Sequence, residues 1–333
     1  MGAAPKKESR THRGSRFLPR VIVLQAVGVA AFVFALVVGE RARPALVALY
    51  LPRQPLLVVG VALAIVAAFA RRRALFAFQS TLCLVVLVPV MGLQAALPRS
   101  PFHAEKTIRL ATYNVYFGKL GRAQLLDEIA AMEVDILVLQ AAFGSMGERL
   151  RERLPDRSIR QDGELVIVSR FPIRDVDVPE PLEGDVKSMF VGYLLETPSG
   201  PLRVFGFHPF SPRSALEREK PWTLDVAQRE AQVGAVVAAS ARPGPPFVIA
   251  GDTNLPGFSS IRRHHFRGLY DAFDEVGFGL GYTFPAKRPW MRIDRVLSGA
   301  GVRFIEARVG PQGASDHRPL FAVLELVSVD VAP

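Results

Sequence analysis

The chain has 333 residues, of which 50% are hydrophobic, and a formal net charge of +10. Residues 1–103 hold 13 Lys/Arg and 2 Asp/Glu, whereas residues 104–333 hold 28 and 29. The positive charge therefore belongs to the N-terminal region, and the nearly neutral remainder argues against a large domain that binds nucleic acid through bulk charge. Cys83 is the only cysteine, which excludes an internal disulfide.

The N-terminal region is predicted to lie in a membrane. Residues 1–20 contain six Lys/Arg and are expected to form a disordered, basic cytoplasmic arm. Residues 21–97 follow as a membrane region with three predicted helices, at about 21–39, 54–70 and 74–97. The first is a run of 19 residues without a charge, longer than the core of a cleaved signal peptide. The middle helix is short, and it either begins at residue 54 or pairs with an interfacial piece at 45–51.

The basic flanks predict the topology. Six Lys/Arg precede the first helix, and Arg71, Arg72 and Arg73 join the second to the third. Such residues remain on the cytoplasmic side of a membrane. Three spans would then place everything after Leu97 on the other side, so we expect a multi-pass protein of the cell (inner) membrane with an extracytoplasmic C-terminal domain. If the middle segment is only a re-entrant hairpin, the domain is cytoplasmic instead.

A linker is expected at 98–106, a folded domain at 107–327 and a tail at 328–333. From residue 107 onward, short apolar runs alternate with amphipathic segments. The predicted strands are Ile108–Tyr113, Val134–Gln140, Glu164–Ser169, Met189–Glu196, Leu202–His208, Phe247–Gly251, Ile293–Leu297, Val302–Ala307 and Leu320–Leu326. The predicted helices are Arg122–Met132, Met146–Leu154 and Leu216–Ala239. This order suggests a two-layered β core covered by helices.

Two strings place polar side chains beside predicted strands. Gly251-Asp252-Thr253-Asn254 follows one apolar run, and Ser315-Asp316-His317 precedes another. A buried sheet can aim such side chains into one cleft. Carboxylate, amide and imidazole groups set in this way suit metal-assisted attack of water on phosphorus.

Seven short motifs occur in a recognisable order over about 220 residues. They are Ala111–Val115, Asp135–Gln140, Ile167–Ile173, Phe207–Pro209, Gly251–Asn254, Arg292–Val296 and Ser315–His317. In this order they resemble the endonuclease/exonuclease/phosphatase superfamily, the DNase I-like fold, some branches of which carry similar N-terminal helices. The resemblance implies an α+β fold, a four-layer α/β/β/α sandwich, preceded here by three transmembrane helices.

The resemblance also implies roles for individual residues. Asp252 would orient or deprotonate water, and Asn254 would hydrogen-bond the phosphate or the nucleophile. His208 and His317 would stabilise or protonate the phosphoryl group, and Asp294 would hold one imidazole in its tautomer. The metal, Mg²⁺ or Mn²⁺, would be bound by Asn114 and Asp316, with Gln140 as a further candidate.

One position departs from the family pattern. The residue equivalent to Gln140 is normally followed by a glutamate that binds the metal, and here Ala141 follows. Either the remaining groups and water hold the metal more weakly, or another carboxylate such as Glu164 or Asp162 replaces the lost one. The third alternative is a domain that binds phosphate without hydrolysing it.

The sequence therefore predicts a membrane-anchored, metal-dependent phosphoric ester hydrolase. Its expected partners are the lipid bilayer and a phosphodiester, a phosphomonoester or a lipid-linked (pyro)phosphate at the membrane surface. Nucleic acid is a less favoured substrate, because a surface nuclease would need a basic groove. The alternatives are such a nuclease, and a catalytically silent phosphate-binding membrane receptor or scaffold.

Overall fold

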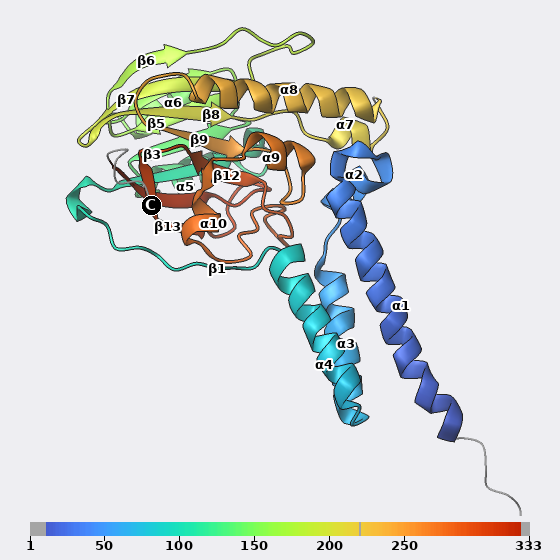
Figure 1. Ribbon diagram of the computed structural model, residues 1–333. Coiled ribbons are helices and arrows are strands. Elements are labelled where there is room, and N and C mark those ends of the chain that lie inside the picture. The colour runs from blue at the N-terminus through green and yellow to red at the C-terminus, as the bar shows by residue number, and fades with distance from the viewer. Residues whose placement is uncertain (1–10, 220, 328–333) are drawn as a thin grey trace, which may run out of the picture.

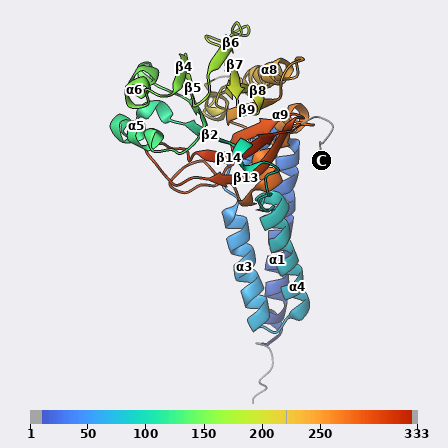
Figure 2. The same ribbon diagram turned by 90° about the vertical axis from the view of Figure 1, so that its left-hand side faces the viewer.

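The computed structural model describes residues 11–219 and 221–327, and the predicted tail at 328–333 lies outside them. Two six-stranded sheets form the core of the domain (Figures 1 and 2). In the order β13-β14-β2-β3-β5-β4, the first sheet contains Val302–Val309, Leu320–Leu326, Ile108–Asn114, Ile136–Gln140, Leu165–Ser169 and Ser158–Asp162. In the order β10-β12-β9-β8-β7-β6, the second contains Tyr270–Asp271, Asp294–Ser298, Phe247–Asp252, Gly200–Phe207, Phe190–Thr197 and Ile173–Asp177. All nine predicted strands are present, with ends within two residues of those expected.

The period of two along the strands explains the layers. Leu110 and Val138 point from the first sheet into the core between the sheets, whereas Ala111 and Leu139 point outward. The outward residues pack under α5 (Arg122–Ala130) and α6 (Met146–Arg153). The outer face of the second sheet is covered in the same way by α8 (Trp222–Ser240) and α9 (Ser260–His265). Short α10 (Ala272–Val276) closes one edge of the core. The predicted α/β/β/α sandwich is confirmed.

The predicted helix at 216–239 is interrupted. The structure has α7 (Arg213–Leu216) and then α8, which begins only at Trp222. Pro221 precedes α8, and a proline lacks the amide hydrogen that a continuing helix requires. The separate α7 packs against the apolar N-terminal helices through Ala215 and Leu216.

Four helices precede the domain: α1 (Thr11–Val38), α2 (Arg43–Tyr50), α3 (Gln54–Phe69) and α4 (Arg73–Val85), the last continued by a π-helical turn at Val86–Val90. Within the described part of the chain, two helices are long and apolar enough to cross a membrane: Phe17–Arg41 and Arg73–Val90. The number rises to three if α2 and α3, bent by 73°, form one span. The expectation of a disordered segment is wrong for 11–20, which is helical, because extending an existing helix is easier than nucleating one. Residues 1–10 lie outside the described part.

Helices α1, α3 and α4 project from the domain as a bundle (Figures 1 and 2). Its outer surface is apolar: the side chains of Leu24, Phe34 and Phe69 are exposed, Phe69 to 87%. Inside the bundle, Gln79 donates a hydrogen bond to Gln25 at 3.0 Å. Exposed apolar side chains around a polar interior contact are typical of helices packed in lipid.

Candidate active site

Two parallel strand pairs bring the polar motifs to one edge of the sandwich. In the first sheet, Asn114 at the end of β2 is paired with Gln140 at the end of β3. In the second, β8 and β9 run parallel, and His208 and Asp252 lie at their ends. The antiparallel strand β12 begins with Asp294, which is paired directly with Asp252. Residues far apart in sequence therefore meet where the parallel strands end and β12 begins.

Gly251 allows this convergence. A Cβ atom at this position would lie 1.8 Å from the carbonyl oxygen of Phe207 on the neighbouring strand. Any side chain would therefore push β8 and β9 apart and displace Asp252. The close packing of β8 against β9 therefore explains why a glycine precedes Asp252.

A cavity of about 410 Å³ opens at this edge. Six of the predicted site residues line it, together with Ala141: Asn114, His208, Asp252, Asn254, Asp316 and His317. Asp294 lies behind this wall, fully buried, and reaches the cavity through His317. The structure thus brings all five predicted catalytic residues into one cluster, with both predicted metal ligands beside it.

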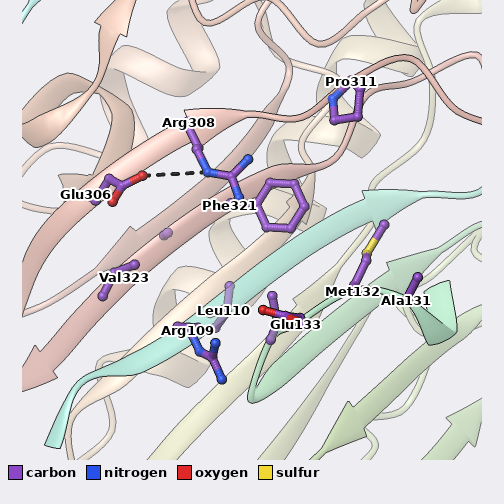
Figure 3. Close-up of a pocket in the computed structure, with 12 residues that line it drawn as sticks. Arg109, Leu110, Ala131, Met132, Glu133, Glu306, Arg308, Pro311, Phe321 and Val323 are labelled. Atoms are coloured by element: carbon purple, nitrogen blue, oxygen red, sulfur yellow. Dashed lines mark ion pairs between the residues drawn. The ribbon is translucent and has the colours of Figure 1, made fainter. Parts of the chain in front are cut away.

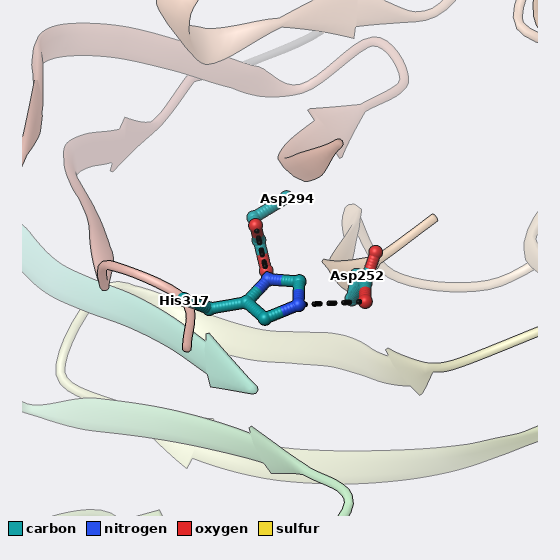
Figure 4. A group of neighbouring side chains, drawn as sticks. All are labelled: Asp252, Asp294 and His317. Atoms are coloured by element: carbon teal, nitrogen blue, oxygen red, sulfur yellow. Dashed lines mark hydrogen bonds and ion pairs between the residues drawn. The ribbon is translucent and has the colours of Figure 1, made fainter. Parts of the chain in front are cut away.

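His317 is held between two carboxylates (Figure 4). Its Nδ1 lies 2.9 Å from Oδ2 of Asp294, and its Nε2 lies 3.6 Å from Oδ2 of Asp252. An ionised carboxylate can only accept, so Nδ1 carries the proton and donates it to Asp294. Burial would lower the pKa of His317, but the charges of Asp294 and Asp252 outweigh it and raise the pKa to about 9. The imidazole is therefore cationic at neutral pH.

The second histidine has its own acid. Nδ1 of His208 lies 2.9 Å from Oε1 of Glu164, and its Nε2 lies 3.7 Å from Oδ2 of Asp252. Lys187 forms an ion pair with the same glutamate. Burial alone would raise the pKa of Glu164, but the hydrogen bonds and charges of His208 and Lys187 lower it to about 2. Glu164 thus orients His208 as Asp294 orients His317.

Asp252 lies between the two imidazoles. Its Oδ2 accepts a hydrogen bond from Nδ2 of Asn114 at 2.9 Å, and its Oδ1 accepts one from the backbone amide of Asn254 at 2.9 Å. Asn254 has a positive φ of 53° and donates its side-chain amide to the carbonyl of Pro209 at 3.1 Å. Distances of 3.6–3.7 Å from Oδ2 to the histidines are too long for hydrogen bonds. Asn114 is therefore a hydrogen-bond donor to Oδ2 of Asp252, whereas both imidazoles stand off at a longer distance.

The predicted alternatives for metal binding are occupied elsewhere. Gln140 is fully buried, and its amide bonds Thr112 and the carbonyl of Val138, so this side chain is not a ligand. Asp162 pairs with Arg160. Glu164 lies close to the missing position, since its backbone carbonyl accepts a hydrogen bond from the amide of Ala142 at 3.0 Å. The carboxylate of Glu164, however, faces His208. None of these side chains replaces the missing glutamate.

The remaining donors still fit a hard divalent cation. Oδ1 of Asp316 is buried and has no hydrogen-bond partner among the described residues. Burial, together with the negative charges of Asp252 and Asp294, raises the pKa of Asp316. A cation beside this oxygen would relieve both effects. The amide oxygen of Asn114 accepts a hydrogen bond from the backbone amide of Tyr116 at 3.1 Å and has a second lone pair for such a cation. Because Ala141 contributes no oxygen, water would have to supply more of the coordination shell than in a site with the glutamate.

The membrane region forms part of the cavity wall, which the sequence did not indicate. Tyr50, the last residue of α2, lines the cavity and donates its hydroxyl hydrogen bond to the Asn254 carbonyl at 2.9 Å. The hydroxyl accepts a hydrogen bond from Arg229 of α8 at 3.2 Å. Nearby, the carboxylate of Glu40 accepts hydrogen bonds from Ser260 at the start of α9. The apolar N-terminal helices are therefore fixed to the edge of the domain where the cavity opens.

A separate cavity of about 490 Å³ lies near the other end of β2 (Figure 3). Its charged side chains are Arg109, Glu133, Glu306 and Arg308, of which the last two form an ion pair at 3.6 Å. Among the described residues that line it, there is no histidine beside a carboxylate. The chemistry is therefore assigned to the cavity that contains His208, Asp252 and His317.

Comparisons with known proteins identify the family of the chain and its fold. A family model described as "Endonuclease/Exonuclease/phosphatase family" matches residues 111–317. No curated protein matches the chain in sequence. The fold resembles that of an endonuclease/exonuclease/phosphatase from Beutenbergia cavernae, at 19% identity and a TM-score of 0.52 over 68% of this chain and 73% of that one. It also resembles the 3′ phosphatase NExo from Neisseria, solved with a product DNA hairpin, at 20% identity and a TM-score of 0.51 over 66% of this chain and 100% of that one. A third similar structure is a humanized D. rerio TDP2, at 16% identity and a TM-score of 0.53 over 66% of this chain and 99% of that one.

Proposed function

The chain belongs to the endonuclease/exonuclease/phosphatase family, and we propose that it is a membrane-anchored, metal-dependent hydrolase of phosphoric esters. The family consists of phosphoesterases and nucleases, and the domain keeps a paired set of catalytic groups. The observation that carries the proposal is the convergence of two acid–histidine pairs on Asp252. Two oriented imidazoles around one carboxylate suit attack of water on phosphorus.

In the proposed mechanism, Asp252 accepts a proton from the attacking water, whose oxygen bonds to phosphorus as the bond from phosphorus to the leaving oxygen breaks. The leaving oxygen takes a proton from solvent, and Asn114 holds the Asp252 carboxylate in place. His317, charged at neutral pH, donates a hydrogen bond from Nε2 to a phosphoryl oxygen while Asp294 retains the proton on Nδ1. His208 approaches the same group from the second sheet. Asp316 and Asn114 would hold the divalent cation, which when bound neutralises charge on the phosphoryl oxygens.

The surroundings of the cavity favour a substrate presented at a membrane. Lys119 and Arg213 line it and supply flexible positive charge for a phosphate. Phe117, Leu216 and Met291 add apolar surface, and Tyr50 joins the cavity to the membrane region. This combination fits a phosphate attached to an apolar group, so we propose a phospholipid head group or a lipid-linked (pyro)phosphate ahead of DNA.

We also propose that the domain lies outside the cytoplasm, at the inner membrane. The start of α1 and the connection from α3 to α4 lie at the end of the bundle away from the domain (Figure 1). Arg71 and Arg72 are in that connection, and Arg73 begins α4. Positive residues favour the cytoplasmic side, so the domain would lie opposite. Alkaline phosphatase fused after Leu97 would be active if the domain is extracytoplasmic, and inactive if it is cytoplasmic.

The substrate proposal is tested with the full chain in vesicles and Mn²⁺ or Mg²⁺. The kcat/KM for one phosphodiester presented in the membrane is compared with that for a water-soluble short-chain analogue with the same head group. Asp252→Asn is the inactive control. The expected result is a kcat/KM at least about tenfold higher for the membrane-presented ester. Equal values would contradict a membrane substrate while leaving hydrolysis intact. Phosphate binding without turnover of either ester would favour the silent receptor, for which Ala141 is the supporting observation.

A further inference from the structure

A third cavity, of about 260 Å³, lies where the apolar N-terminal helices meet the domain. Four arginines line it: Arg53, Arg262, Arg263 and Arg292. Among the described residues that line it, Asp274 is the single carboxylate. The wall therefore carries a formal excess of three positive charges.

The carboxylate does not compensate all four arginines. Asp274 already pairs with Arg262, at 3.2 Å, and with Arg292. Within the described part of the chain, Arg53 and Arg263 have no carboxylate within 4.0 Å. Arg53 donates to the Val90 carbonyl at 2.9 Å and is only 7% exposed. A buried cation without an anion is costly, and a bound anion would offset that cost.

The cavity lies at the level where the membrane helices end. Arg53 immediately precedes α3, and Val90 ends the π-helical turn that continues α4. Arg263 donates to the carbonyl of Val37 at the end of α1, at 3.0 Å. Trp290 also lines the cavity, and an indole with one polar edge is typical of the membrane–water interface. Lipid phosphates would occupy this level around a membrane bundle.

We propose that this cavity binds the phosphate of an anionic phospholipid. Guanidinium groups are suited to phosphate, because their planar forks donate two parallel hydrogen bonds. Met291 lines both this cavity and the catalytic one, so the bound lipid would lie beside the active site without entering it. The inference rests on the proposal that the helices cross a bilayer.

The test uses the full chain in nanodiscs of phosphatidylcholine with and without phosphatidylglycerol. Retained phosphatidylglycerol is measured by native mass spectrometry, which requires no turnover. Arg53→Gln and Arg263→Gln are each expected to weaken retention at least about fivefold, in line with the loss of one interfacial charge. Arg53→Lys retains the charge but not the planar fork, and is expected to bind more weakly than wild type but more tightly than Arg53→Gln.

The matched control is Arg41→Gln, which removes an exposed charge just after α1 and outside the cavity. It is expected to retain phosphatidylglycerol as the wild type does. An equal loss in the control, or no loss in Arg263→Gln, would overturn the inference. Inorganic phosphate that displaces the lipid at equal concentration would assign the cavity to free phosphate instead. Failure of the chain to float with vesicles would overturn the membrane proposal itself, whereas flotation without lipid selectivity overturns only this inference.

Discussion

Asp294 accepts a hydrogen bond from Nδ1 of His317 at 2.9 Å, inside a wall where neither side chain is appreciably exposed. This contact fixes the orientation of the imidazole ring, so that Nε2 faces Asp252 and the cavity. It also stabilises the charged form of the ring, whose pKa is raised to about 9 although burial opposes this. The pair therefore determines both the direction and the charge of the group that faces the phosphate.

Activity and stability are predicted to fall at alkaline pH. The pKa of His317 is raised from an ordinary 6.5 to about 9, so its stabilising charge is fully present below pH 6.5 and is lost as pH rises through 9. Asp294→Asn removes the charge that favours protonation, so the alkaline decline should move to lower pH. A pH profile of kcat/KM for both proteins measures the shift. An unchanged decline would show that another group titrates.

Glu164→Gln should reduce kcat by about 10²-fold, because His208 loses the acid that orients its Nδ1 proton. KM should change little, since the glutamate lies behind the imidazole. Asp162→Asn is the matched control: it is two residues away and pairs with Arg160 instead. The two variants are compared under saturating substrate, and an equal effect on kcat would indicate a general loss of fold.

Ala141→Glu should strengthen divalent metal binding at least about tenfold, because it adds a carboxylate to the cavity wall near Asp316. Ala141→Gln is the control of equal size without charge. Activation by Mn²⁺ is titrated for both variants and the wild type. If the glutamate variant requires as much metal as the glutamine variant, the metal does not bind beside position 141.

Tyr50→Phe should lower the free energy of unfolding by about 1–3 kcal/mol, because it removes the hydroxyl that joins Asn254 to Arg229. It should also lower kcat, since Asn254 loses one of its supports. Thermal unfolding in detergent and turnover in vesicles measure the two effects. Tyr270→Phe, in β10, is the control. A similar loss of unfolding free energy in that variant would show that the effect does not come from the hydrogen bond between Tyr50 and Asn254.

The sequence predicted much of the fold because the determining signals are local. Nine strands follow from alternating apolar residues, and Asp252 and His317 stand in short motifs beside two of them. The break before Pro221 was missed, although proline rules could have located it. The helical state of 11–20 was missed because its stability comes from the apolar helix that follows.

Other parts of the site depend on assembly of the whole chain. Glu164 and His208 are 44 residues apart, and only the packing of the two sheets brings them together. Tyr50 and Asn254 are 204 residues apart, in a predicted membrane segment and a predicted soluble domain. No periodicity or spacing links such residues. Nothing in the sequence excluded Gln140 as a further metal ligand, but its side-chain amide donates a hydrogen bond to Thr112 on the adjacent strand.

The central claim is that this domain hydrolyses a phosphoric ester with Asp252 as the base. The most direct measurement is turnover of a vesicle-presented phosphodiester by the full chain as Mn²⁺ is titrated from zero, with wild type beside Asp252→Asn. The account predicts saturable, metal-dependent turnover in the wild type and a loss of about 10²–10⁴-fold in Asp252→Asn at unchanged thermal stability. Turnover that is equal in the two proteins, or absent from the folded wild type at every metal concentration, would contradict it.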